Sequence, residues 1–232
     1  MSLILILSKT KMQGNRVCVG GVDLDNRRSL RLLDCDGKHE TINDCPYELL
    51  EVWNIDYNRT YRRSAPHLED VNVIKRNRTS YNEVDPQELI KLSRYNINVY
   101  RTSLLDTFEG ELRSTDNGSL YISEYGNIPN FSTCFWWNDK PLRKNRFSTE
   151  EKIKFDYKIS DNKWYHIAYV GLEDMPDIIP QGTLIRLSLA HWWRPDELSE
   201  KRCYLQLSGI YTISKDEGDK ALKFGPNIVL SI

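Results

Sequence analysis

Residues 16–33 read RVCVGGVDLDNRRSLRLL and hold the clearest signature of the fold. Two short apolar runs flank the polar turn at residues 25–28, a pattern that is typical of a β-hairpin. The apolar positions from Val17 to Leu24 keep a period of two only if the phase shifts at the two adjacent glycines, Gly20 and Gly21. We therefore expect a glycine-centred bulge or bend there, and curled, bulged hairpins of this kind suit small β-barrels.

Short strand-like runs separated by polar turns continue along the rest of the chain. Alternating or apolar segments predict further strands at residues 3–7, 47–57, 71–74, 119–122, 131–137, 153–159, 164–170, 182–190 and 203–211. The last two alternate strictly, and we expect them to pair with each other across the intervening loop.

One segment has the signature of a helix. Asp85-Pro86-Gln87-Glu88 supplies an N-cap, a proline at the first helical position and an acid in the first turn, and the apolar residues that follow extend the pattern toward Leu104 and Leu105. The chain is therefore predicted to be mainly β. We divide it into a first β-barrel unit, residues 1–84, and a second β-unit, residues 85–232, which begins with the helical segment.

Composition limits the classes of protein to consider. The chain has 232 residues, of which 40% are hydrophobic, and its 32 basic side chains nearly balance its 33 acidic ones. No global field therefore directs it to nucleic acid or to a membrane, and any charged partner must be bound by a local patch. The apolar run from Leu3 to Leu7 is too short for a signal peptide or a membrane span. Five cysteines without a C-x-x-C pair fit a reducing compartment, so we expect a cytoplasmic protein.

Aromatic and basic residues occur together in one segment of the first unit. Single-stranded nucleic acid is bound by rings that stack on bases and by cations that follow the phosphates. Residues 57–78 contain six basic and two acidic side chains. The candidate binding residues are Tyr57, Arg59, Tyr61, Arg62, Arg63, Lys75, Arg76 and Arg78. The alternative is that the two tyrosines cap the barrel and that the arginines are solvated loop charges.

A second cluster of rings and cations lies in the second unit. Three of its residues, Trp136, Arg143 and Lys144, are further candidates for binding nucleic acid. Neighbouring side chains of a strand point to opposite faces, so Trp136 and Trp137 cannot both lie in the core. The alternative is that the outward ring packs between the two units, and the same choice arises for the pair Trp192 and Trp193.

The sequence offers no convincing catalytic or metal site. Cys35, His39 and Cys45 share one loop, but their spacing fits no common zinc module. No G-x-S-x-G, H-E-x-x-H or P-loop motif occurs. His67 with Glu69 and Asp70 is a conceivable metal-nuclease group, although neighbouring carboxylates on an extended chain diverge. We expect no catalytic residue, no metal and no cofactor.

Several segments resemble the bacterial dual OB-containing domain family. They are residues 17–33, the segment PHLEDV at 66–71, and residues 187–193 together with 203–209, and the likeness runs nearly end to end. The resemblance implies two OB-like barrels, with the helical insertion between or within them. It also implies a role in sensing or binding nucleic acid in bacterial systems that act against phage or plasmids.

These observations favour a non-enzymatic module that holds single-stranded DNA or RNA. A protein of another class, an adaptor that docks an effector protein through exposed aromatic side chains, remains the competing interpretation. A metal-dependent nuclease centred on His67 is a third. A few local cations on a neutral protein predict modest affinity that weakens steeply with salt, and no membrane partner is expected.

Overall fold

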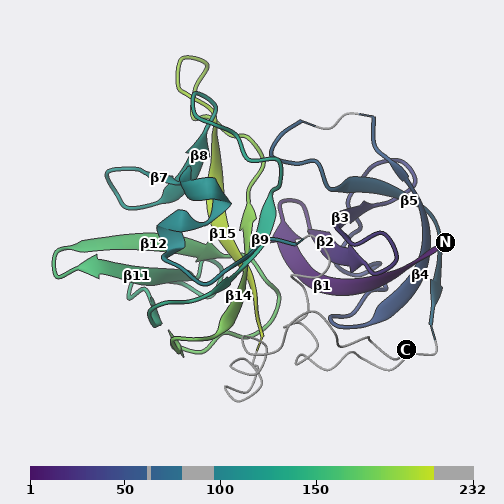
Figure 1. The fold of residues 1–232 in the computed structure, drawn as a ribbon, viewed down its shortest axis with the longest axis horizontal. Helices are drawn as coiled ribbons and strands as arrows, with labels where there is room; N and C mark the ends of the chain where they lie inside the picture. Colours follow the sequence, from purple (N-terminus) through teal and green to yellow (C-terminus); the bar gives the residue numbers. More distant parts are fainter. Residues whose placement is uncertain (62–63, 80–96, 212–232) are drawn as a thin grey trace.

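The computed structural model describes residues 1–61, 64–79 and 97–211, which form two β-units side by side (Figure 1). The N-terminal barrel closes through five strands in the order β1-β2-β3-β5-β4. These strands are β1 (Ser2–Met12), β2 (Arg16–Asp23), β3 (Arg28–Leu33), β4 (Val52–Arg59) and β5 (Asp70–Arg78). All neighbours are antiparallel except β3 and β5, which are parallel. This is a five-stranded Greek-key barrel of the OB type.

The bulge predicted at the two glycines belongs to the partner strand. The pairing of β1 with β2 shifts register between Ile6 and Ser8, opposite Gly20 and Gly21, so the extra residue is Leu7. Strand β2 itself keeps its alternation, because Val17 and Val19 lie in the barrel core and Val22 lies outside it. The expected phase shift within β2 is therefore wrong. Val22 is apolar because it packs against the other unit.

The C-terminal unit repeats the strand order of the N-terminal barrel. Its strands are β6 (Val99–Tyr100), β7 (Arg113–Ser114), β8 (Leu120–Ser123), β9 (Thr133–Trp137), β10 (Leu142–Lys144), β11 (Lys154–Ser160), β12 (Lys163–Tyr169), β13 (Ile178–Ile179), β14 (Leu184–Leu189) and β15 (Arg202–Tyr211). The path β10-β11-β12-β15-β14-β9 matches β1-β2-β3-β5-β4-β1 if β9 and β10 count as one interrupted strand. The parallel pair β12 and β15 then corresponds to β3 and β5.

Asn138 accounts for the interruption between β9 and β10. This buried residue donates through its amide nitrogen to the carbonyl oxygens of Lys140 and Pro180, and its amide oxygen accepts from the backbone nitrogen of Thr183. The side chain thus satisfies backbone groups that a continuous strand would pair with its neighbours.

The helical insertion is not present in the part of the chain that the structure describes. Residues 80–96, where the helix is predicted to begin and where the boundary between residues 84 and 85 falls, lie outside the described residues. Residues 97–110 form the short strand β6 and two 3-10 turns, η2 (Leu104–Asp106) and η3 (Phe108–Gly110). The Ser103 capping box begins η2, and Leu104 and Phe108 anchor the two turns in the core of the C-terminal unit.

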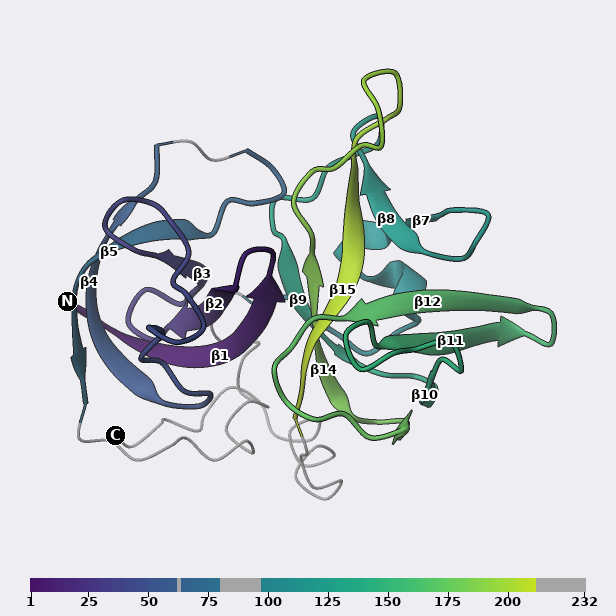
Figure 2. The ribbon, with the colours of Figure 1, turned by 180° about the vertical axis from the view of Figure 1, so that it is seen from behind.

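The two units share a buried apolar cluster, which we call the inter-unit cluster. Figures 1 and 2 show β9, β14 and β15 on the side of the C-terminal unit that adjoins the N-terminal barrel. The buried members of the cluster are Leu5, Leu7, Val22, Val52, Ile97, Phe135, Leu184 and Tyr211. The hydroxyl of Tyr211 also donates to the carbonyl oxygen of Leu7. Burial of this size makes the contact between the units part of the fold.

Candidate nucleic-acid interface

The face that OB barrels use for ligands is covered in the N-terminal barrel. Ligands of OB folds bind on the outer face of the second and third strands and on the loop between the fourth and fifth. Here β2 presents Gly20 on that face, and a Cβ at this position would lie 2.5 Å from Nη2 of Arg186 on β14. A side chain at position 20 would have to displace the Arg186 guanidinium and the Ser8 hydroxyl, so glycine favours the close approach of the two units. Burial also raises the pKa of the neighbouring Cys18 thiol.

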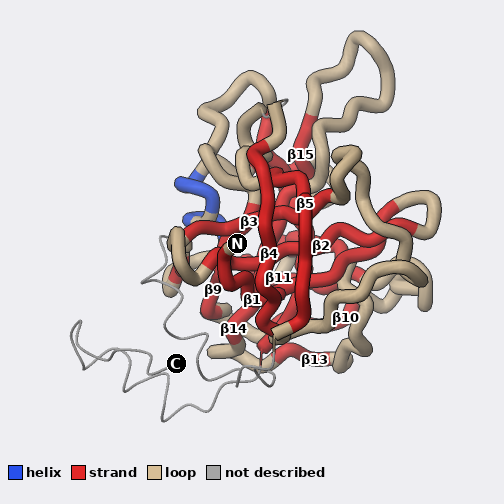
Figure 3. Tube along the Cα trace, turned by 90° about the vertical axis from the view of Figure 1, so that its right-hand side faces the viewer, coloured by secondary structure: helices blue, strands red, loops and turns tan. Residues whose placement is uncertain are grey.

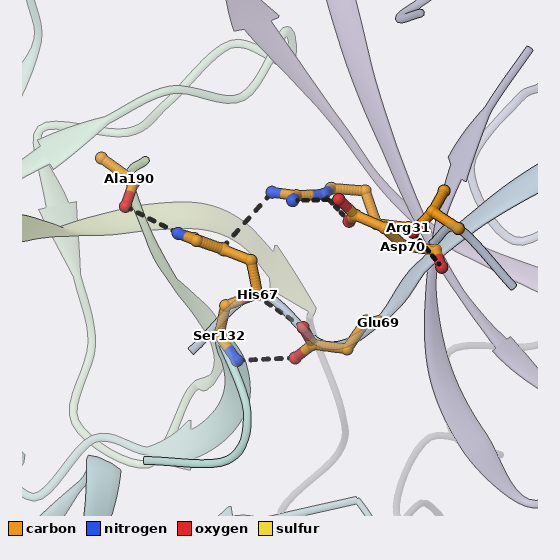
Figure 4. A network of polar contacts seen from close by, with 7 residues as sticks. Arg31, His67, Glu69, Asp70, Ser132 and Ala190 are labelled. Atoms are coloured by element: carbon orange, nitrogen blue, oxygen red, sulfur yellow. Dashed lines mark hydrogen bonds and ion pairs between the residues drawn. The ribbon is translucent and has the colours of Figure 1, made fainter. Parts of the chain in front are cut away.

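The loop between β4 and β5 is held by the C-terminal unit (Figure 4). The Glu69 carboxylate accepts from the backbone nitrogen of Ser132 at 2.6 Å and from its hydroxyl at 3.0 Å. The ring nitrogen Nε2 of His67 donates to the carbonyl oxygen of Ala190 at 3.1 Å. The indole of Trp192 donates to the carbonyl oxygen of Ala65 at 3.0 Å, so this ring contacts the other unit, whereas Trp193 is 54% exposed. A loop that serves OB ligands elsewhere is here a docking element.

The three residues of the conceivable nuclease group do not converge. Asp70 binds Arg31, and Glu69 binds Ser132 (Figure 4). The ring of His67 lies between Ala190 and Arg31, and its Nδ1 is 3.5 Å from Nη1 of Arg31. Among the described residues, no group of three or more His, Cys, Asp or Glu side chains is placed to hold a metal ion. Each carboxylate already has its partner.

The equivalent face of the C-terminal unit is open. By strand order, β11 and β12 correspond to β2 and β3, and their hairpin extends away from the N-terminal barrel (Figures 1 and 2). Phe155 and Tyr157 of β11 face the core, so Lys154 and Lys158 face outward. On β12 the outward Trp164 pairs with Lys158, whose Nζ lies 5.6 Å from the ring centroid. Trp164 is 37% exposed.

Further cations and rings flank these two strands. Arg143 on β10 is exposed next to β11, and in the following loop the Arg146 guanidinium lies 4.6 Å from the ring centroid of the exposed Phe147. We call the surface formed by Arg143, Arg146, Phe147, Lys154, Lys158 and Trp164 the β11–β12 face.

Carboxylates near the β11–β12 face are mostly engaged. Asp156 accepts from the ring nitrogen Nδ1 of His166 at 2.6 Å and from the amide of Asn145. Asp161 pairs with Lys158 at 2.7 Å, and that hydrogen bond lowers the pKa of the Asp161 carboxyl. Lys154, Arg143 and Arg146 form no ion pair within the described residues. The face therefore has cations available for phosphates beside stacking rings.

In the first predicted segment, residues 57–78, some candidate side chains are exposed and others are engaged in contacts within the barrel. Figure 3 views the N-terminal barrel from its outer side, with β4 and β5 toward the viewer. Arg59, Tyr61 and Lys75 are exposed, while Arg62 and Arg63 lie outside the described residues. The other three are engaged: Tyr57 donates to Asp23 and accepts from Arg28, Arg76 pairs with Glu40, and Arg78 pairs with Glu51. These three are not free to bind nucleic acid as we predicted.

The candidate residues of the second predicted cluster also differ in their exposure. Trp136 is 0% exposed and donates to the carbonyl oxygen of Thr102, so its prediction as a base-stacking residue is wrong. Its neighbour Trp137 faces outward, packs against the inter-unit cluster and lies under the Arg101 guanidinium. Arg143 is exposed, and Lys144 lies 3.8 Å from Asp177.

Sequence reasoning missed Lys154, Lys158 and Trp164. The signal that could have found them is the alternation within residues 153–170, which places both lysines on one face of β11 and opposite Trp164 of β12. The pattern in these segments predicts strands and, on its own, no binding surface.

Comparison with known proteins gives the following relations. The model of a family described as "Dual OB-containing domain" matches residues 3–210. No curated protein matches the chain. Among solved structures, a murine DNA-binding protein bound with double-stranded DNA matches with a TM-score of 0.31 and 9% identity, over 92% of this chain and 96% of that one. No helix among the described residues has the length and apolarity needed to cross a membrane.

Proposed function

Because the chain belongs to the dual OB-containing domain family, we propose that its open OB surface, the β11–β12 face, binds single-stranded nucleic acid. The observation that carries the proposal is the contrast between the two equivalent faces. The face of β2 and β3 is closed by Arg186 and by the docked loop before β5, whereas the face of β11 and β12 is exposed. The exposed one has rings beside cations, as single-strand binding requires.

Geometry favours single strands over duplexes. The rings of Trp164 and Phe147 are exposed and can stack only on bases whose faces are free, as in unpaired DNA or RNA. Lys154, Arg143 and Arg146 would then lie along the phosphates. We propose that the protein is a non-catalytic module that senses foreign nucleic acid in the bacterial cytoplasm. This role agrees with the one that the family resemblance implies.

Replacement of Trp164 by alanine is expected to weaken oligonucleotide binding about 5- to 150-fold, because one base stack contributes roughly 1–3 kcal/mol. The measurement is fluorescence anisotropy of the full chain with labelled single-stranded DNA, single-stranded RNA and duplex. The wild-type affinity should fall steeply as salt increases, and Lys154→Ala should reduce the slope of that dependence.

The exposed ring of Tyr125 lies outside the β11–β12 face and provides the matched control. Tyr125→Ala should bind like the wild type. Loss of binding in Tyr61→Ala, with Trp164→Ala unchanged, would place the strand on the N-terminal barrel and reject our assignment. Absence of binding to all three nucleic acids at low salt would favour the adaptor, for which Trp193 and Leu198, both strongly exposed on the loop before β15, are the side chains to test.

A further inference from the structure

A pocket of about 220 Å³ lies between the two units, apart from the β11–β12 face. Residues at the ends of β3, β4 and β5 line it from the N-terminal barrel, and residues 97–98 and 130–133 line it from the other side. We call it the inter-unit pocket. Ligand sites commonly occur where two domains meet.

Two arginines give this pocket its charge. Arg28 and Arg59 both line it, and neither forms an ion pair within the described part of the chain. The Nη2 of Arg28 donates to the hydroxyl of Tyr57 at 2.6 Å, but its Nε is buried without a hydrogen-bond partner in the structure. A buried donor of a charged group without a partner is costly, and an anionic ligand beside the guanidinium would offset its uncompensated positive charge.

The one carboxylate in the pocket lining is already satisfied. Both oxygens of Glu69 accept hydrogen bonds from Ser132, and burial raises the pKa of this carboxyl. It therefore opposes an anion less than a free carboxylate would. The remaining lining combines the amides of Asn98 and Asn130 with apolar walls, which include Leu30, Leu68, Val71, Ile97 and Phe131.

We propose that the inter-unit pocket binds a small phosphate ester of about mononucleotide size. Arginine is suited to phosphate because its planar fork donates two parallel hydrogen bonds. The phosphate would lie against Arg28 and Arg59, and the organic group against the apolar wall near Ile97 and Phe131. Pockets for drug-sized ligands span about 300–1,000 Å³, so this smaller volume fits a small ligand. The inference does not depend on strand binding at the β11–β12 face.

The test uses 5′-AMP as the probe, with adenosine and inorganic phosphate at the same ionic strength. Isothermal titration and thermal unfolding of the full chain should show binding of one AMP per chain and a rise in Tm, since a ligand of the folded state stabilises it. Adenosine should not bind, and phosphate should bind more weakly than AMP. Equal binding of adenosine and AMP, equal binding of phosphate and AMP, or no binding of AMP would each overturn the proposal.

Variants locate the site. Arg59→Ala should weaken AMP binding roughly 10- to 100-fold, because hydrogen bonds to charged groups are the strong ones. Arg59 is exposed, so the fold should survive its loss. Lys38→Ala removes an exposed cation outside the pocket and should bind AMP like the wild type. Unchanged AMP affinity in Arg59→Ala would overturn the assignment.

A competition experiment separates this proposal from strand binding. Oligonucleotide affinity should be unchanged in saturating AMP, because the two sites are distinct. Displacement of the oligonucleotide by AMP would place the mononucleotide on the strand site and overturn the pocket. If AMP binds to the pocket and no oligonucleotide binds at all, strand binding alone is rejected.

Discussion

Replacing Asp70 by alanine is expected to lower the free energy of unfolding by about 3–5 kcal/mol, as is typical when one partner of a buried ion pair is removed. The carboxylate of Asp70 accepts from Nε of Arg31 and from Nη2 at 2.8 Å, and the two side chains are only 14% and 12% exposed. Without Asp70 the buried guanidinium of Arg31 would lose the carboxylate with which it forms two hydrogen bonds. Urea denaturation followed by circular dichroism measures the change.

A surface ion pair provides the control. Asp177 is almost fully exposed and lies 3.8 Å from Lys144, so Asp177→Ala should cost at most about 1 kcal/mol. If Asp70→Ala unfolded at the same urea concentration as Asp177→Ala, the buried pair would not contribute the stability that we assign to it.

Lowering the pH from 7 to 5 is expected to reduce the free energy of unfolding by about 2–4 kcal/mol through two histidines. Burial lowers the pKa of His67 to about 3 and that of His39 to about 4, from an ordinary value of 6.5. Below pH 6.5 the unfolded chain takes up protons at these rings while the folded chain does not. The stability that they contribute is therefore complete above pH 6.5 and is lost as the pH falls toward 4 and then 3.

Besides burial, the charged groups around the ring of His67 contribute to the lowering of its pKa. The guanidinium of Arg31 and the ring of His191 both disfavour a positive charge on His67, whose ring centroid lies 4.8 Å from that of His191, whereas Asp70 favours it. His67 should contribute about 2 kcal/mol between pH 7 and pH 5, and His39 less, because its ring is partly exposed.

Urea unfolding at pH 7, 6 and 5 measures this dependence, and the variant His67→Gln tests its origin. An amide at position 67 keeps a donor for the carbonyl oxygen of Ala190 but does not titrate. The variant should lose more than half of the change in stability between pH 7 and pH 5, because His67 contributes more than His39. A variant with the full dependence would show that other groups cause it.

Local patterns predicted the parts of the fold that rest on neighbouring residues. The hairpin of β2 and β3 and the antiparallel pair β14 and β15 follow from alternation and turn chemistry within one segment, and both predictions are confirmed. The phase shift in β2 and the exposure of Trp136 were wrong for a common reason. Alternation shows that two faces differ, but not which face meets the core when a second unit buries the other. The helix at residue 85 stays a prediction.

The candidate site was harder to predict than the strands. A count of charges in residues 57–78 cannot show that Arg76 and Arg78 are paired with Glu40 and Glu51, which lie far away in the sequence. Which of the two OB faces is open also depends on how the units dock, and no single segment encodes that. The alternation around the lysines of β11 predicts a strand, but a binding surface follows only when their shared outward direction is considered together with β12.

The inter-unit cluster also determines whether the two units can be produced as separate fragments. Leu5, Leu7 and Val22 on one side and Phe135 and Leu184 on the other would meet water if the chain were divided between the two units. Apolar patches of that kind make isolated fragments aggregate. We therefore expect each half to be insoluble when it is expressed alone, and the two halves to assemble when they are expressed together. The smallest part of this protein that folds as a soluble unit is then the pair of barrels.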